Sequence, residues 1–434
     1  MPTALLSLLF ACGQPPEAEE AAPLPQLPTS SCGEAYDWQP LTDMGEVLDW
    51  EPVEEWSMSA ASIRSLLAMG DVPDTGEIQY GSRVYRVRYR TQDRGRPAEA
   101  TGLIALPDAE GLEPATLLYM HPTTGFEDFC APSARDIFWG AVPIALAGAG
   151  YAVAAPDYLG QNGFGAEAEA RHPYLVAEAT AVAGLDAVRA LWSFSEADIS
   201  HRGLILGASQ GGGGAVWAER YAGAYLPELE LQGSVIAVPL LDLVAWSEEG
   251  ATELSVGSVG AALALASMKD WYGLAADLGE VVVPEQLETV EEVMATECPR
   301  TALPEGITSL DQVFTPAWQQ AGAEGAQVDW SPWGCVLAEN SVGHAPVNQG
   351  AGTPVMMVLG GADDVALTAS QRIAYRALCD EGHQVIALEC AGLGHYDAVL
   401  QTMALQLQWL RQLDAGEAMG EPCGEISVVD CAAR

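Results

Sequence analysis

Gly207-Ala208-Ser209-Gln210-Gly211 is the most informative segment of this chain. The apolar run 203–206 comes directly before it, and a segment with a helical pattern, residues 215–220, follows. The sequence G-x-S-x-G between a strand and a helix is typical of a nucleophile elbow, a sharp turn that exposes its serine at one edge of a sheet. Flanking glycines are needed because a side chain there would collide with the neighbouring strand and helix. The pattern predicts that Ser209 is a nucleophile.

The sequence on both sides of this turn alternates between strand and helix patterns. Residues 82–90 alternate apolar and basic side chains, as a strand with one solvated face does. Apolar runs typical of strands buried on both faces occur at residues 115–120, 151–158, 234–238, 354–359 and 384–388, and helical spacing occurs at 139–148, 175–192, 370–379 and 397–413. This alternation predicts an α/β fold, with a mostly parallel central sheet and helices on both of its faces.

The alternation stops between about Leu240 and Pro346, where residues 260–271, 284–295 and 310–321 have helical patterns. A long insertion after a core strand predicts a helical cap over the edge that carries Ser209. A stabilising elaboration without a gating role is the alternative. The predicted organisation is a lipoprotein-type signal at 1–12, a disordered tether at 13–31, the first part of the core at 32–240, the cap insertion at 241–346 and the second part of the core at 347–434.

The chain is strongly acidic, with a net charge of −42 from 60 acidic and 18 basic residues among its 434. Such a surface repels nucleic acid, so we expect no nucleic-acid partner. It also disfavours strongly anionic substrates. The composition does not indicate an oligomeric state.

The first residues resemble an export signal. A short apolar run ends in Leu9-Phe10-Ala11-Cys12, similar to the site at which bacterial lipoproteins are cleaved and lipidated. The preceding Met1-Pro2-Thr3 lacks the usual positive charge. We expect export and lipidation at Cys12, which would anchor the protein to a bacterial membrane or cell surface. An ordinary cleaved signal peptide, giving a periplasmic or secreted protein, is the alternative.

Eight cysteines remain of the nine when Cys12 is set aside, and an even number in an exported chain predicts disulfides. Proximity in sequence favours the pairs Cys379–Cys390, Cys423–Cys431 and Cys298–Cys335, which leaves Cys32 with Cys130. Buried free thiols are the alternative for several of them. The chain has no C-x-x-C pair, so no zinc site is expected.

A serine hydroxyl needs a base that removes its proton and an acid that orients the base. His395 is the predicted base, because it lies in a glycine-bearing loop after a buried strand and before the last helix. Asp363 is the predicted acid, since it follows another strand with the spacing G-x-x-D from Gly360. Asp364, its neighbour, is the first alternative and Asp242 a remote one.

An oxyanion hole needs two N–H donors. The residue after the nucleophile supplies one, here the backbone N–H of Gln210. The loop after an earlier strand, His121-Pro122-Thr123-Thr124-Gly125, would supply the other. Pro122 has no N–H, so Thr123 is the predicted donor and Thr124 the alternative.

Taken together, these motifs resemble the α/β-hydrolase superfamily, and more narrowly the secretory lipase family of exported triacylglycerol lipases and esterases. The similarity spans about residues 78–413; its matching stretches are residues 150–160, His172-Pro173-Tyr174-Leu175-Val176, residues 185–190 and the elbow 207–213. Departures are the proline in the 121–125 loop and the segment 363–367, which lacks the family's usual proline. The resemblance implies an α/β-hydrolase that cleaves ester or lipid substrates.

The expected activity is therefore carboxylic-ester hydrolysis through an acyl-enzyme on Ser209, with no metal or organic cofactor. Lipase and short-chain esterase remain open alternatives. A serine peptidase or acyltransferase on the same fold is a second possibility, and a non-catalytic surface protein with a hydrolase fold is a third.

Overall fold

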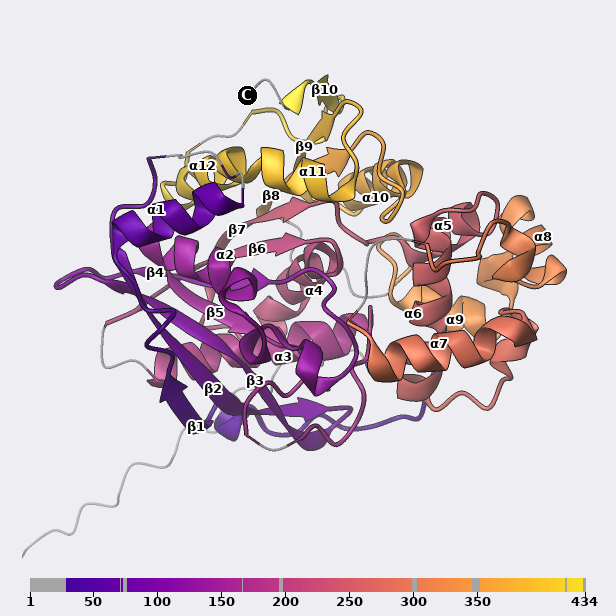
Figure 1. Ribbon diagram of the computed structural model, residues 1–434, viewed down its shortest axis with the longest axis horizontal. Coiled ribbons are helices and arrows are strands. Elements are labelled where there is room, and N and C mark those ends of the chain that lie inside the picture. The colour runs from indigo at the N-terminus through magenta and orange to yellow at the C-terminus, as the bar shows by residue number, and fades with distance from the viewer. Residues whose placement is uncertain are drawn as a thin grey trace, which may run out of the picture.

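The computed structural model describes residues 29–70, 72, 76–165, 167–194, 198–298, 303–345, 352–417 and 420–431. Within these residues the centre is a ten-stranded sheet in the order β1-β2-β3-β5-β4-β6-β7-β8-β9-β10 (Figure 1). The strands are β1 (Val47–Pro52), β2 (Gly81–Asp93), β3 (Arg96–Asp108), β4 (Ala115–Met120), β5 (Ala152–Pro156), β6 (Ser200–Ala208), β7 (Glu230–Ala237), β8 (Pro354–Gly360), β9 (Gln384–Cys390) and β10 (Ser427–Val429). The pairs β1–β2, β2–β3 and β3–β5 are antiparallel. From β5 to β10 in this order, all neighbouring strands run parallel.

Helices cover both faces of the sheet. One face packs against α1 (Ala60–Met69), α2 (Ile137–Gly148) and α12 (Met403–Asp414). The other packs against α3 (Ala177–Phe194), α4 (Gln210–Tyr225) and α10 (Thr368–Asp380). The strand β5 is buried along its whole length, as a strand covered on both faces must be. The predicted fold class is confirmed.

The insertion between β7 and β8 is helical. It contains α5 (Leu243–Gly250), α6 (Val256–Tyr272), α7 (Pro284–Thr296), α8 (Pro316–Glu324) and α9 (Trp333–Glu339), which gather at one side of the sheet (Figure 1). These helices share an apolar cluster that includes the buried Trp246, Trp318 and Trp333. The cluster reaches the core at Val176, just before α3, and at Ala179 within it. The predicted insertion is therefore helical and packs on the core.

Two predicted helices are wrong in extent. Over 310–321, only a 3-10 turn (Leu310–Gln312) forms before α8 begins at Pro316, a residue that favours the first position of a helix because it has no N–H. The helix predicted over 397–413 is two helices, α11 (His395–Gln401) and α12, which meet at Thr402. The Thr402 hydroxyl donates to the carbonyl of Ala398, a local bond of the kind that bends helices. The elements β1, α1, α5, α9 and β10 were not predicted.

The eight cysteines after Cys12 form four disulfides within the described residues, as the even count predicts. Every predicted pair is wrong, since the bonds are Cys32–Cys335, Cys130–Cys298, Cys379–Cys423 and Cys390–Cys431.

Strand length explains the error at the C-terminal end of the chain. Cys379 lies near the end of α10, and Cys390 ends β9 at the opposite edge of the sheet. A seven-residue strand spans about 20 Å, so the two cysteines cannot meet. The C-terminal segment instead runs parallel to β9 through β10, which brings Cys423 to one end of this strand and Cys431 to the other.

Several predictions fall on residues outside those described. Cys12, the signal at 1–12 and residues 13–28 of the predicted tether are among them. Across the described ranges, no helix is long and apolar enough to span a bilayer.

Candidate active site

Ser209 occupies the sharp turn between β6 and α4. Its backbone has φ +56° and ψ −122°, a conformation that residues other than glycine rarely adopt. A Cβ on Gly207 would lie 2.1 Å from the carbonyl oxygen of Gly211, and a Cβ on Gly211 would lie 2.1 Å from that of Met120. The Ser209 N–H donates to the carbonyl of Ala237 at 2.9 Å. Close backbone packing therefore requires both glycines and holds the serine in its strained turn.

The structure brings Ser209, His395 and Asp363 together. The Ser209 hydroxyl lies 2.8 Å from His395 Nε2, and His395 Nδ1 lies 2.8 Å from Asp363 Oδ2. The three residues follow β6, β9 and β8, all at the carboxyl edge of the parallel strands. All three are buried, with exposed fractions of 4–5%.

Asp363, and not Asp364, contacts His395. Its Oδ1 accepts from the backbone N–H groups of Val365 and Ala366, both at 2.9 Å, and its Oδ2 accepts from Gln371 Nε2 at 3.0 Å. Asp364 is exposed. With Asp363 accepting, Nδ1 of His395 carries the proton, which leaves Nε2 free to accept the Ser209 hydroxyl.

Gln210 opens α4, with Ser209 as the residue before the first turn. Its backbone N–H is therefore one of the free donors at the positive end of a long helix. The side chain of Gln210 is buried, and its Nε2 lies 2.7 Å from Nε2 of His172. Sequence reasoning missed His172 as a neighbour of the elbow, because no local pattern indicates a contact across 38 residues.

The loop 121–125 follows β4 and is held from several sides. The Thr123 hydroxyl donates to the Tyr174 hydroxyl at 3.2 Å, and the Tyr158 hydroxyl donates to the carbonyl of His121 at 2.8 Å. Gln161 Nε2 donates to the carbonyl of Gly125 at 2.9 Å. Burial lowers the pKa of His121 to about 4, so this ring is neutral at neutral pH.

Asp242, the remote alternative for the acid, and three other histidines lie away from Ser209. Asp242 caps α5 by accepting from the N–H of Ala245 at 3.0 Å. His201 stacks on Trp192, His383 is buried beside Glu219, and His344 is exposed. In the part of the chain that the structure describes, no group of three or more His, Cys, Asp or Glu side chains is placed to hold a metal ion.

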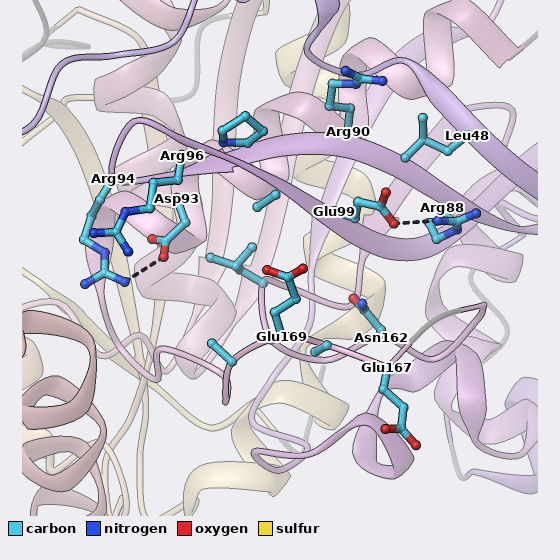
Figure 2. A pocket seen from close by; sticks show the side chains of 16 residues that line it. Leu48, Arg88, Arg90, Asp93, Arg94, Arg96, Glu99, Asn162, Glu167 and Glu169 are labelled. Atoms are coloured by element: carbon cyan, nitrogen blue, oxygen red, sulfur yellow. Dashed lines mark hydrogen bonds and ion pairs between the residues drawn. The ribbon is translucent and has the colours of Figure 1, made fainter.

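A cavity of about 710 Å³ lies between the β2–β3 hairpin and residues 159–162 and 167–170 (Figure 2). Its charged lining is balanced: Arg88, Arg90, Arg94 and Arg96 stand with Asp93, Glu99, Glu167 and Glu169. Arg88 pairs with Glu99 at 2.5 Å, and Arg94 pairs with Asp93 at 2.9 Å. The lining contains neither Ser209 nor His395, so this cavity is separate from the candidate active site.

Solved structures share the architecture. The ligand-bound rice cell wall degrading esterase LipA from Xanthomonas oryzae superposes with a TM-score of 0.68 at 21% identity, over 86% of this chain and all of that one. A putative hydrolase from Legionella pneumophila superposes with a TM-score of 0.69 at 19% identity, over 86% of this chain and all of that one. Candida antarctica lipase A in its closed state superposes with a TM-score of 0.66 at 14% identity, over 89% of this chain and 86% of that one. At such identities these likenesses establish the fold.

A search of curated protein sequences gives no significant match. The model of the secretory lipase family matches residues 142–421, which is well over half of the chain. This match includes the elbow, the helical insertion and the two loops that carry Asp363 and His395. The chain therefore belongs to the secretory lipase family.

Proposed function

We propose that this protein is a serine hydrolase that cleaves carboxylic esters through Ser209, His395 and Asp363. The observation that carries the proposal is the unbroken pair of 2.8 Å contacts from the serine hydroxyl through the imidazole to the carboxylate. Membership of the secretory lipase family supports esters as the substrate class. The net charge of −42 disfavours strongly anionic esters.

In the proposed mechanism His395 Nε2 takes the proton of Ser209 as the serine oxygen attacks the ester carbonyl. The same proton passes to the leaving alcohol, and an acyl-enzyme remains. Water then loses a proton to His395 and attacks the acyl group, which releases the acid and restores Ser209. The Asp363 carboxylate stabilises the imidazolium in both halves of the cycle.

The tetrahedral intermediates carry a negative oxygen that needs donors. We assign the backbone N–H groups of Gln210 and Thr123 to this role, with Thr124 as the alternative to Thr123. Support for Gln210 comes from its place at the first turn of α4, where the helix dipole favours negative charge. Loss of one such donor lowers kcat by about 10²–10³.

We also propose that residues 241–346 cap the active-site edge of a core made of 32–240 and 347–434. Four disulfides and the family match support an exported protein. Cleavage at a signal over 1–12 and lipidation of Cys12 complete this proposal. Mass spectrometry of the mature N-terminus from a bacterial membrane fraction tests them.

Ser209→Ala tests the central claim. We expect hydrolysis of p-nitrophenyl esters to fall by at least about 10⁴ with no change in thermal unfolding, because the nucleophile is lost while the fold remains. Ser234→Ala, which changes a buried serine in β7, is the matched control and should retain activity. A fluorophosphonate should label the wild type at residue 209 and leave Ser209→Ala unlabelled. Near wild-type activity in Ser209→Ala would overturn the proposal.

The substrate panel decides between the alternatives. Esters of increasing chain length, assayed with and without an oil–water interface, distinguish a lipase from a short-chain esterase. Amide hydrolysis or acyl transfer to alcohols that exceeds ester hydrolysis would point to a peptidase or an acyltransferase. A folded wild type that neither turns over esters nor reacts with the fluorophosphonate would be a non-catalytic member of the family.

A further inference from the structure

His172 holds the side chain of the residue that follows the nucleophile. Gln210 Nε2 lies 2.7 Å from His172 Nε2, and the two residues are 2% and 1% exposed. The mechanism above uses only the backbone N–H of Gln210, so this side-chain contact has no role in it. A polar contact buried this completely beside the serine calls for an explanation.

The protonation of His172 follows from its two partners. Nδ1 lies 2.9 Å from the carbonyl oxygen of Leu159, which can only accept, so Nδ1 carries the ring proton. Nε2 is then an acceptor, and the Gln210 amide donates to it. Burial lowers the pKa of His172 to about 4, so the ring stays neutral and this pattern persists at neutral pH.

The ring of His172 belongs to an aromatic stack that also supports the 121–125 loop. The ring of Tyr158 stacks on that of His172, with the centroids 5.7 Å apart and the planes at 14°. It also stacks on the ring of His121, with the centroids 4.1 Å apart and the planes at 29°. The Tyr158 hydroxyl donates to the carbonyl of His121. One stack therefore connects the two segments to which we assign the oxyanion donors.

The cap insertion fixes His172 from the other side. The hydroxyl of Ser267, in α6, donates to the carbonyl of His172 at 3.0 Å and accepts from the N–H of Tyr174 at 2.8 Å. A short series of hydrogen bonds thus runs from α6 through His172 to Gln210, directly beside Ser209.

We propose that His172 is a positioning residue for the oxyanion hole, which anchors the Gln210 side chain and thereby fixes the direction of the Gln210 backbone N–H. The proposal rests on the proposed function, since it assumes that this N–H receives the negative oxygen. Catalytic donors must keep their geometry to within about 0.5 Å, and a locked side chain restricts rotation of its own backbone. Ser267 extends this support to the cap.

The variants His172→Phe and His172→Gln separate positioning from packing. Phenylalanine retains a ring for the stack but cannot accept from Gln210, so we expect kcat to fall tenfold or more while KM changes less than twofold. Glutamine offers a carbonyl to Gln210 and an amide to Leu159, so we expect kcat within about threefold of the wild type. A trifluoromethyl ketone, which forms a tetrahedral adduct with the serine, should bind His172→Phe more weakly by the same factor as kcat.

A double-mutant cycle with Gln210→Met tests whether His172 acts through Gln210. Methionine keeps the length of the side chain and the backbone N–H but cannot donate to His172. If the proposal holds, Gln210→Met lowers kcat as His172→Phe does, and the double variant loses no more than either single variant. Ser267→Ala should lower kcat in the same direction by a smaller factor.

Three results would overturn this inference: a lower melting temperature of His172→Phe with wild-type kcat, a change in KM alone, or losses that multiply in the double variant. Its failure is distinguishable from that of the proposed function. An active Ser209→Ala would refute both the proposed function and the role of His172. An inactive Ser209→Ala together with a fully active His172→Phe would refute only the role of His172.

Discussion

The carbonyl oxygen of Cys390 accepts a hydrogen bond from the backbone N–H of Gly361 at 2.9 Å. The same oxygen accepts from the N–H of Leu393 at 3.2 Å. Gly361 lies two residues before Asp363, and Leu393 lies two residues before His395. The end of β9 therefore joins the loops of the proposed acid and base, and the disulfide Cys390–Cys431 fixes this point to the C-terminal segment.

Removal of this disulfide should affect activity as well as stability. We expect Cys390→Ser/Cys431→Ser to lower both the melting temperature and kcat at 25 °C, because the loops of Asp363 and His395 lose their common support. Its control is Cys379→Ser/Cys423→Ser, which opens a loop of similar length (separations of 41 and 44 residues) at the far edge of the sheet. Both should cost about 2–5 kcal/mol in unfolding free energy. Equal kcat in the two variants would contradict this coupling.

Asp363→Asn should reduce kcat by about 10³–10⁴, since an amide no longer favours the imidazolium of His395. Asp364→Asn is the matched control: it makes the same chemical change one residue later, on an exposed side chain, and should stay within about twofold. Steady-state kinetics with a soluble ester and thermal unfolding of both variants provide the measurement. If Asp364→Asn were the inactive variant, the acid would be assigned to the wrong residue.

Two glycines of α4 should respond in opposite ways to alanine. Gly211→Ala would place its Cβ 2.1 Å from the backbone oxygen of Met120, and this oxygen cannot move without disturbing β4. We therefore expect the variant to lose several kcal/mol of unfolding free energy and most of its activity. Gly223→Ala meets nothing within 4 Å and should stabilise by about 0.5–1 kcal/mol, because alanine loses less backbone entropy in a helix. Denaturant unfolding checks both variants. A stable, active Gly211→Ala would mean that the elbow can relax.

Glu178, in α3, should make stability depend on pH. Burial raises the pKa of its carboxyl to about 8, and nearby Asp93 and Glu339 add to the shift, while the hydrogen bond that the Tyr36 hydroxyl donates to it opposes the shift. The folded protein thus holds a proton that the unfolded chain releases near its ordinary pKa of 4.5. This contribution to stability is complete below pH 4.5 and is lost as pH rises to about 8.

Glu178→Gln should remove that dependence. As pH rises from 5 to 9, the unfolding free energy of the variant should increase relative to that of the wild type, which loses the contribution of Glu178. The difference should reach up to a few kcal/mol, since one pKa unit corresponds to about 1.4 kcal/mol. Unfolding free energies at both pH values, with the exposed Glu110→Gln as a control for the change in net charge, provide the test. A parallel pH dependence in Glu178→Gln and the wild type would show that another group is responsible.

Local patterns in the sequence predicted much of the fold. The buried runs at 115–120 and 384–388 are strands because continuous apolar residues suit a sheet covered on both faces, and the elbow glycines mark a turn that tolerates no side chain. The helix over 397–413 was predicted too long, because its apolar spacing continues through a break that one threonine hydroxyl stabilises. Periodicity reports the face of an element and not where its hydrogen bonds stop.

Local sequence patterns established most of the alternating strands and helices, the position of the serine turn, and a short list of acids and bases that follow strands. Steric clashes and the period of apolar side chains fix these features, because both act between residues that are close in sequence. Three features required the folded chain: the contact of Asp363, and not Asp364, with His395, the pairing of the cysteines, and the contact of His172 with Gln210. Those contacts depend on how far each strand runs and which segments it brings to the same edge, and no local pattern encodes such distances.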